Sequence, residues 1–273
     1  MRTISQELLE SKVYQAIISM SEELPSSFLG LLKEAEGKEK DERAKHILEQ
    51  ILENAGIAKN KHIPLCQDTG IIVVFLEVGR DIHFDYDPYL IINQAVSKAY
   101  QDGYLRKSVV SDPFERINTK DNTPAIIHTK LVEGAKLRIK LLMKGAGSEN
   151  MSVVKMLLPN AGKDGVKQLV LDTVKEAGGK ACPPLLVGIG IGGDLEKVAL
   201  LAKEALTFDF LNQTAYEKEL MEAINELKIG PMGLGGEVTC LGVKVNTYPC
   251  HIASLPVAIN LQCHAARHRE IEI

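Results

Sequence analysis

The sequence contains no tryptophan, and aromatic residues make up only 5% of its 273 positions. A buried core must therefore be built mainly from leucine, isoleucine, valine and alanine. Basic residues are not in excess either: 32 lysines and arginines stand against 36 acidic residues, so the net charge is −4. A chain without a basic excess lacks the charge that binds a phosphate backbone, which argues against nucleic acid as a partner.

Long hydrophobic segments are missing as well. The longest uninterrupted apolar run, residues 71–76, is far shorter than the roughly 18 residues that a membrane helix requires. The first ten residues include acidic side chains and no apolar segment of the kind found in a secretion signal. With 45% hydrophobic and 25% charged residues, the composition is that of a globular protein. We therefore expect a soluble, cytoplasmic protein.

Cysteine is sparse and irregularly spaced. The five cysteines are Cys66, Cys182, Cys240, Cys250 and Cys263, and no two form a Cys-x-x-Cys pair. An odd number spread over a long chain argues against the disulfide framework of a small secreted domain. The missing Cys-x-x-Cys pair argues against a zinc ribbon or a thioredoxin-type site. Taken alone, each cysteine is most simply a small buried hydrophobic residue.

Residues 1–57 are predicted to be helical, because Leu9, Val13 and Ile17 recur every four residues and a similar apolar stripe continues through Ile51. Beyond them, strands are predicted where β-branched and aromatic residues concentrate, and helices where the helical period returns. The predicted strands are 71–78, 125–132 and 136–143, and the predicted helices are 89–100, 164–177, 194–206 and 214–228.

The strands at 125–132 and 136–143 flank a short segment around Gly134, which predicts a β-hairpin. A hairpin requires antiparallel pairing, so a purely parallel sheet is not expected. No repeat or low-complexity linker divides the chain. The sequence therefore predicts an α+β fold: a helical N-terminal lobe over residues 1–57, followed by a mixed sheet with packed helices, in a single compact domain that spans residues 1–273.

Three polar, glycine-rich clusters interrupt the apolar sequence. They lie at residues 64–70 (PLCQDTG), 144–150 (KGAGSEN) and 182–194 (CPPLLVGIGIGGD). In the first, a rigid turn aims Cys66 at a metal ion, with polar neighbours that order a substrate; the alternative is a plain turn with an incidental cysteine. In the second, small residues allow backbone amides to converge on an anion, although many such loops merely turn the chain.

The third cluster contains the pattern Gly-x-Gly-x-x-Gly, at Gly188, Gly190 and Gly193, between an apolar strand and a helix. That is the setting of a dinucleotide-binding fingerprint, and Asp209 lies near where a ribose-binding acid is expected. A nucleotide-dependent oxidoreductase is therefore one alternative function. Against it, the pattern lies deep in the chain, and little after it resembles a second βαβ unit.

Cys66, Cys182 and Cys263 each begin or end a polar or glycine- and proline-rich segment. Three thiolates around a [4Fe–4S] cluster leave one iron without a protein ligand, and that iron can act as a Lewis acid toward a substrate hydroxyl. A regulatory iron–sulfur sensor without turnover would use the same ligands, so it is a second alternative. Spacing alone does not decide between an enzyme and a sensor.

Five segments together resemble the iron–sulfur-dependent class I fumarase and tartrate dehydratase family, and more narrowly its α, N-terminal, cluster-binding part. They follow the family's order between about residues 63 and 267 and read PLCQDTG, LRKSVVSDPFERINTKDNTPAIIH, KGAGSENMS, CPPLLVGIGIGGD and HIASLPVAINLQCHAARH. Two positions depart from the common pattern: Ala146 stands where a third glycine is frequent, and Lys107 where proline is frequent. Neither departure removes a chemical group on which the resemblance depends.

The resemblance implies roles for particular residues. The family's cluster ligands correspond to Cys66, Cys182 and Cys263. Its substrate-binding residues correspond to Gln67, Arg106, Gly145 and Gly147. Its catalytic acid corresponds to Asp68, and the histidine paired with that acid corresponds to His251. Cys240 and Cys250 lie outside the ligand positions, and Asn122 and Thr123 are expected to line the same polar wall.

The activity implied is that of a hydro-lyase, the reversible hydration of fumarate to (S)-malate. This reaction makes or breaks a C–O bond, and hydroxide is a poor leaving group, so a Lewis-acidic iron and a proton donor lower the barrier. Asp68 is the expected donor, and Arg106 with backbone amides would stabilise charge that develops on a carboxylate. Dehydration of L-tartrate is the alternative within the same family.

The resemblance also implies an incomplete site. The matched segments supply one acid and one arginine, but no second arginine clamp in a motif of its own and no clear base for the C–H proton. In single-chain relatives, a second domain follows at about the point where this sequence ends. We therefore expect a separate β subunit that completes the active site, in an α2β2 assembly.

Overall fold

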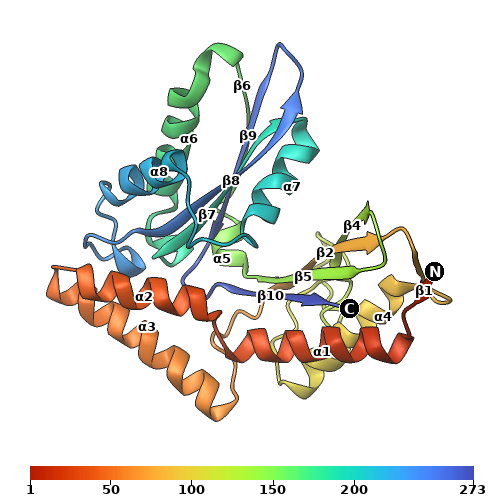
Figure 1. Cartoon of the computed structure of the whole chain (residues 1–273). Coiled ribbons are helices and arrows are strands. Elements are labelled where there is room, and N and C mark those ends of the chain that lie inside the picture. The colour runs from red at the N-terminus through yellow and green to blue at the C-terminus, as the bar shows by residue number, and fades with distance from the viewer. The chain divides into compact units, whose positions relative to one another are not determined.

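The computed structural model describes all residues, 1–273, and its contacts divide them into two compact units. Unit 1 consists of Met1–Pro25, Ala55–Gly145 and Arg267–Ile273, and unit 2 consists of Ser26–Asn54 and Ala146–Ala266. Both units contain helices and a sheet, which confirms the predicted α+β class (Figure 1). The single domain expected over residues 1–273 thus contains two such units.

Unit 1 has a four-stranded sheet with helices on one face. Its strands and helices are β1 (Arg2–Thr3), α1 (Gln6–Glu22), β2 (Ile71–Gly79), β3 (Ile82–His83), α4 (Pro88–Asp102), β4 (Ile126–Val132), β5 (Leu137–Lys144) and β10 (Arg267–Glu272). The sheet has the order β10-β5-β2-β4, with β2 parallel to β4 and antiparallel to β5. Alternate residues of β2 and β5, among them Val74 and Leu141, form the main core with α1 and α4.

The N-terminal helices confirm the helical character predicted for residues 1–57. Helix α1 begins after Ser5, whose side chain caps it by accepting a hydrogen bond from the Leu8 amide. Helices α2 (Ser26–Lys38) and α3 (Glu42–Lys61) follow. The three helices are divided between the units: α1 belongs to unit 1, α2 belongs to unit 2, and α3 runs from unit 2 into unit 1.

The predicted hairpin between residues 125–132 and 136–143 is wrong, although both strands exist as β4 and β5. Strand β2 lies between them and pairs with both. The segment that joins β4 to β5 crosses the end of β2 at Gly79. The two lie so close that a Cβ on Gly79 would be 2.3 Å from the Gly134 carbonyl oxygen. Because the side chains of β2 are almost all buried and those of β4 are mostly exposed, β2 takes the centre and β4 the edge.

Unit 2 has a second four-stranded sheet, of order β6-β9-β7-β8. Its strands and α-helices after α3 are α5 (Ala146–Glu149), β6 (Val153–Leu157), α6 (Gly162–Ala177), β7 (Leu185–Gly193), α7 (Leu195–Ala205), α8 (Ala215–Asn225), β8 (Cys240–Cys250) and β9 (Leu255–Gln262). Three short 3-10 helices complete it: η1 (Pro159–Ala161), η2 (Gly178–Ala181) and η3 (Pro231–Gly233). The helices predicted at 89–100, 164–177, 194–206 and 214–228 are confirmed as α4, α6, α7 and α8.

The sheet of unit 2 is covered on both faces (Figure 1). Helices α6 and α8 pack on the face that carries Val187, Val243 and Ile259. Helix α7 packs on the opposite face, where Val198 and Ala202 meet Ala258 of β9. Strand β7 is buried almost throughout, as its nearly continuous apolar sequence predicts.

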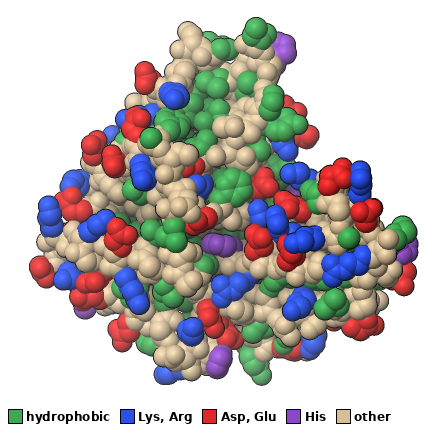
Figure 2. Space-filling view, viewed as in Figure 1, with side chains coloured by type: hydrophobic (Ala, Val, Ile, Leu, Met, Phe, Trp, Pro, Cys, Tyr) green, Lys and Arg blue, Asp and Glu red, His purple; other side chains and the backbone are tan.

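Acidic and basic side chains are interspersed over the face shown in Figure 2, without a field of one sign. This distribution agrees with the small net charge of −4 and gives a phosphate backbone no basic patch on that face. None of the helices is both long enough and apolar enough to cross a membrane.

Candidate active site

The first part of the candidate site lies in unit 1, on the turn of residues 64–70 between α3 and β2. In this Pro64–Gly70 turn, Asp68 Oδ1 accepts a hydrogen bond from the Gly70 amide at 2.9 Å, which closes a local turn. Gly70 has a φ of 67°, and a Cβ there would lie 2.4 Å from the Lys144 carbonyl oxygen. Glycine is therefore required here, and it fixes where the chain leaves Asp68 for the strand.

Two buried side chains hold the Pro64–Gly70 turn by its carbonyl groups. The Tyr100 hydroxyl donates to the carbonyls of Thr69, at 2.7 Å, and Gly70, at 3.2 Å. Asn122 Nδ2 donates to the Gly70 carbonyl at 3.1 Å. Burial raises the pKa of Tyr100 above its ordinary value, so the hydroxyl keeps its proton and remains a donor at physiological pH.

The loop that carries Arg106 is tied to the same turn. Thr69 Oγ1 donates to the Arg106 carbonyl at 2.9 Å. Asn122 Oδ1 accepts from the amides of the next loop residues, Ser108 at 2.6 Å and Val109 at 3.2 Å. Asn122, expected to line a polar wall, is fully buried, so it supports the turn and the loop instead of facing a ligand.

Unit 1 brings together the predicted residues that it contains. Gly145 lies beside Asp68, since a Cβ on Gly145 would be 3.0 Å from Asp68 Oδ2. Gln67 and Arg106 have exposed side chains, while Cys66 and Asp68 are half-buried. Gln67 and Asp68 thus lie on the turn itself, Gly145 lies beside Asp68, and the main chain of Arg106 is bonded to Thr69 of the turn.

The second part lies in unit 2, where Cys182 and Cys263 are neighbours. The amide of His264, which follows Cys263, donates to the Cys182 carbonyl at 3.2 Å, and the His264 ring Nδ1 lies 3.0 Å from the same oxygen. Both cysteines are half-buried, and Cys182 has a left-handed φ of 52° at the end of η2. Gly147 belongs to the same region, because a Cβ there would be 3.5 Å from the Lys180 carbonyl oxygen.

The predicted cluster ligands are thus divided, with Cys66 in unit 1 and Cys182 and Cys263 in unit 2. The structure contains no group of three or more histidine, cysteine or acidic side chains arranged to hold a metal ion. None of the five cysteines takes part in a disulfide.

His251 lies away from the two cysteines of unit 2. It precedes the start of the eight-residue strand β9, and Cys263 follows the end of that strand, a span of about 26 Å. Strand β7 also separates His251 from Cys182. The strand begins just after Cys182 and ends at Gly193, and Gly193 lines an open hollow of about 570 Å³ together with His251. His251 is exposed, and its Nδ1 accepts a hydrogen bond from the Ala253 amide at 3.1 Å.

The Gly-x-Gly-x-x-Gly pattern has a packing explanation. Gly188 and Gly190 lie within β7, not in a strand-to-helix turn, and their Cβ atoms would each lie 2.2 Å from a carbonyl oxygen of α7. They allow α7 to approach the sheet closely. The helix N-terminus, where a pyrophosphate would bind, is already capped by Asp194, which accepts from the Lys197 amide. The geometry therefore disfavours the nucleotide-dependent oxidoreductase.

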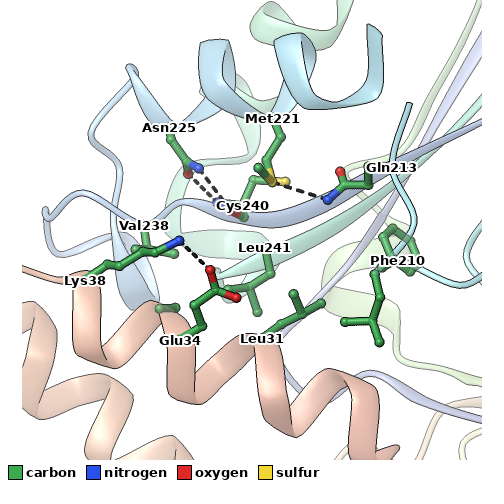
Figure 3. Close-up of a pocket in the computed structure, with 12 residues that line it drawn as sticks. Leu31, Glu34, Lys38, Phe210, Gln213, Met221, Asn225, Val238, Cys240 and Leu241 are labelled. Atoms are coloured by element: carbon green, nitrogen blue, oxygen red, sulfur yellow. Dashed lines mark hydrogen bonds and ion pairs between the residues drawn. The ribbon is translucent and has the colours of Figure 1, made fainter. Parts of the chain in front are cut away.

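Cys240 lines a separate pocket of about 260 Å³ between α2 and the α8–β8 region of unit 2 (Figure 3). Asn225 holds the Cys240 main chain: its Nδ2 donates to the Cys240 carbonyl, and its Oδ1 accepts from the Cys240 amide. Burial raises the pKa of the Cys240 thiol to about 12, so the thiol stays protonated at physiological pH. Cys240 is thus a buried hydrophobic residue, as its position outside the ligand set predicts.

Sequence reasoning missed two residues of the unit 1 site. Tyr100 closes the apolar stripe of α4, and nothing in that stripe indicates that its hydroxyl holds a turn 30 residues earlier in the chain. Arg267 begins the terminal strand and donates from Nη2 to the Asp68 carbonyl at 2.7 Å. Arg267 belongs to the segment HIASLPVAINLQCHAARH, which the sequence analysis singled out. Its burial was not expected, because an arginine at a strand end is usually exposed.

Comparison with known proteins identifies the family of the chain. A family model described as fumarate hydratase (Fumerase) matches residues 10–272, which is almost the whole chain. The chain therefore belongs to the class I fumarase and tartrate dehydratase family, and the resemblance seen in the sequence is confirmed.

Relatives within the family match over most of both chains. A protein of Methanocaldococcus jannaschii, provisionally named L(+)-tartrate dehydratase subunit alpha, is 44% identical over 257 residues, covering 89% of this chain and 90% of the relative. The L(+)-tartrate dehydratase subunit alpha of Escherichia coli K12 is 31% identical over 258 residues, covering 91% and 85% respectively. The subunit of the same name from Escherichia coli UTI89 is 30% identical over 264 residues, covering 93% and 87%.

Proposed function

We propose that this chain is the α subunit of a hydro-lyase that adds water to, or removes it from, a four-carbon dicarboxylate. The observation that carries the proposal is the arrangement in unit 1: the Pro64–Gly70 turn fixes Asp68 beside Gly145, and Thr69 ties the Arg106 loop to the same turn. A positioned acid beside groups that bind anions suits the addition of water next to a carboxylate. Membership of a family described as fumarate hydratase supports the same reaction class.

Each residue has a defined task in this proposal. Asp68 donates a proton to the leaving hydroxyl in dehydration and takes it back in hydration. The exposed guanidinium of Arg106 binds a substrate carboxylate, and the Gln67 amide donates a further hydrogen bond. The backbone amides of Gly145 and Gly147 stabilise the negative charge that develops during the reaction.

A [4Fe–4S] cluster is the proposed cofactor, with Cys66, Cys182 and Cys263 as its ligands. The residues fit such a group, because the three cysteines are half-buried outside any disulfide and two of them are neighbours in unit 2. When bound, the cluster supplies a Lewis-acidic iron for the substrate hydroxyl.

We propose fumarate and (S)-malate as the substrate pair. L-tartrate is a second candidate, favoured by the names of the relatives, which are tartrate dehydratase α subunits. Both reactions need an acid and a group that binds a carboxylate, so the residues of unit 1 suit either substrate.

The proposed assembly is an α2β2 complex in which a β subunit supplies the second carboxylate clamp and the C–H base. The relatives are named as α subunits, which supports a separate β chain. The position of His251 supports pairing of two α chains, because a histidine about 26 Å along β9 from Cys263 is better placed to serve the site of a second copy. Exposed apolar side chains near it, Ile252 in the segment between β8 and β9 and Met156 on β6, suit such a contact.

The test is an anaerobic reconstitution of the chain with iron and sulfide, followed by titration with malate, fumarate and L-tartrate. The proposal expects broad visible absorbance that these acids perturb. Turnover is expected only after the β chain is added, and the ratio of kcat/KM for malate and tartrate then identifies the substrate. Absorbance that none of the acids changes would favour the sensor, and a chain that forms no cluster would contradict both iron–sulfur functions.

A further inference from the structure

Arg267 is an arginine in an unusual place. It is the first residue of β10, it pairs with Met143 of β5, and so it lies on the sheet face that carries the core of unit 1. Its side chain is 1% exposed and is the largest of the fully buried side chains in the protein. Arginine is rarely buried to this degree unless its charge and its donors are matched.

The guanidinium lies against the Pro64–Gly70 turn. Nη2 donates to the Asp68 carbonyl at 2.7 Å. A Cβ on Gly145 would be 3.8 Å from the same Nη2 and 3.0 Å from Asp68 Oδ2. Arg267, the candidate acid and the glycine of the anion-binding loop therefore share one small region of unit 1.

The other donors of Arg267 are not matched by the protein. Its Nε and Nη1 atoms are buried and have no hydrogen-bond partner. Leaving such donors without acceptors is destabilising, and an apolar side chain of similar size at this place would avoid that cost. Stability therefore does not explain this arginine, whereas a task at the neighbouring turn does.

We propose that Arg267 is a positioning residue of the active site: it fixes the main chain at Asp68 and thereby aims the Asp68 carboxylate. Tyr100 and Asn122 hold the following two carbonyls, those of Thr69 and Gly70. Arg267 supplies the contact that neither of them makes. This inference deepens the proposed function. Its effect on kcat rests on that function, whereas its effect on the structure of the turn does not.

The test uses three variants of the full chain. Arg267→Met keeps the length and removes the charge and the donors, and Arg267→Lys keeps the charge. Arg269→Met is the matched control, because Arg269 lies two residues further along the same strand and bonds to Ser19 instead of the turn.

Hydrogen exchange measured by mass spectrometry on the unloaded chain gives the first readout. Arg267→Met is expected to raise exchange about tenfold in the peptide covering residues 65–72, with Arg267→Lys intermediate and Arg269→Met unchanged. The unfolding temperature of Arg267→Met is expected to equal or exceed that of the parent chain. A uniform rise in exchange throughout unit 1 with a lower unfolding temperature would show a merely structural role and overturn the proposal.

Kinetics of the reconstituted complex with its β chain give the second readout. Arg267→Met is expected to lower kcat on the order of a hundredfold while KM changes less than about threefold, and Arg267→Lys is expected to recover part of kcat. Normal exchange in the turn together with normal kcat would overturn the proposal. If exchange changes as expected but the parent complex hydrates none of the acids, the proposed function fails while the positioning of the turn stands.

Discussion

The two units hold their candidate residues in different ways. In unit 1, Asp68 lies on an irregular turn whose carbonyls are held by the buried side chains of Tyr100, Asn122 and Arg267. In unit 2, Cys182 and Cys263 lie at the ends of the regular strands β7 and β9, and the main chain of His264 links them. The unit 1 site therefore depends on a few polar side chains, and the unit 2 site depends on the packing of a sheet.

This difference predicts where substitutions act. A polar side chain that holds a turn is expected to change the turn with a limited effect on the rest of the unit. A residue that sets the distance between a helix and a sheet is expected to change the stability of the whole unit, because closely packed interiors do not absorb added volume.

The largest expected effect is loss of the proposed cluster. Cys66→Ser, Cys182→Ser and Cys263→Ser are each expected to abolish nearly all iron and sulfide binding, because an alcohol is a poorer iron ligand than a thiolate. Iron and sulfide per chain are measured after anaerobic reconstitution. Cys250→Ser is the control, since Cys250 is exposed at the end of β8, and it is expected to load normally. A Cys250 variant that loses its cluster, with a Cys263 variant that keeps it, would refute the ligand assignment.

The next effect tests how closely helix α7 packs on the sheet of unit 2. Gly190→Ala is expected to lower the free energy of unfolding by about 3 kcal/mol, because its Cβ would lie 2.2 Å from the Val198 carbonyl oxygen of α7. Chemical denaturation measures this change. Gly30→Ala is the matched control in the same unit: Gly30 is exposed on α2 with nothing within 4 Å of its Cβ, so alanine is expected to stabilise the chain by about 0.5–1 kcal/mol. Equal effects of the two variants would contradict the packing role of β7.

Smaller effects are expected from the polar contacts of unit 1. Asn122→Ala takes the acceptor from the Ser108 and Val109 amides and one of two donors from the Gly70 carbonyl, and is expected to lower the free energy of unfolding by about 2 kcal/mol. Tyr100→Phe removes only a hydroxyl and is expected to lower it by about 1 kcal/mol. Denaturation curves give both values. If Tyr100→Phe lowers the free energy of unfolding more than Asn122→Ala does, the main support of the turn is Tyr100 of α4 and not Asn122.

An effect of the same size as those of the polar contacts is a pH dependence that belongs to unit 1. Burial, helped by the positive charge of Arg269, lowers the pKa of His268 to about 4. The unfolded chain, in which histidine has a pKa of about 6.5, therefore binds more protons between pH 6.5 and pH 4, and stability falls as the pH falls through this window. Between pH 7 and pH 5 the loss is expected to be about 1–2 kcal/mol. Denaturation of His268→Gln is expected to show a flatter pH dependence, and a variant with an unchanged slope would assign the dependence to other groups.

Much of this architecture follows from local sequence. The apolar period predicts α4, α6, α7 and α8, and their starts carry the expected signals, such as Asp87 before Pro88 and the Thr214–Glu217 capping box. Strands β2, β4 and β5 also appear where β-branched residues predict them. The candidate residues around the Pro64–Gly70 turn could be named in advance, because they belong to continuous segments that resemble one family.

By itself, the sequence determined most of the helices and strands, the family and the choice of candidate residues, because periods, caps and motifs are properties of neighbouring residues. Only the tertiary structure decided that β2 separates β4 from β5, since pairing order depends on which strand buries both faces. It also decided that Tyr100 and Arg267 hold the turn at Asp68, and that His251 and Cys263 lie at opposite ends of β9. These contacts join residues up to 199 positions apart, and no local pattern encodes such a partner.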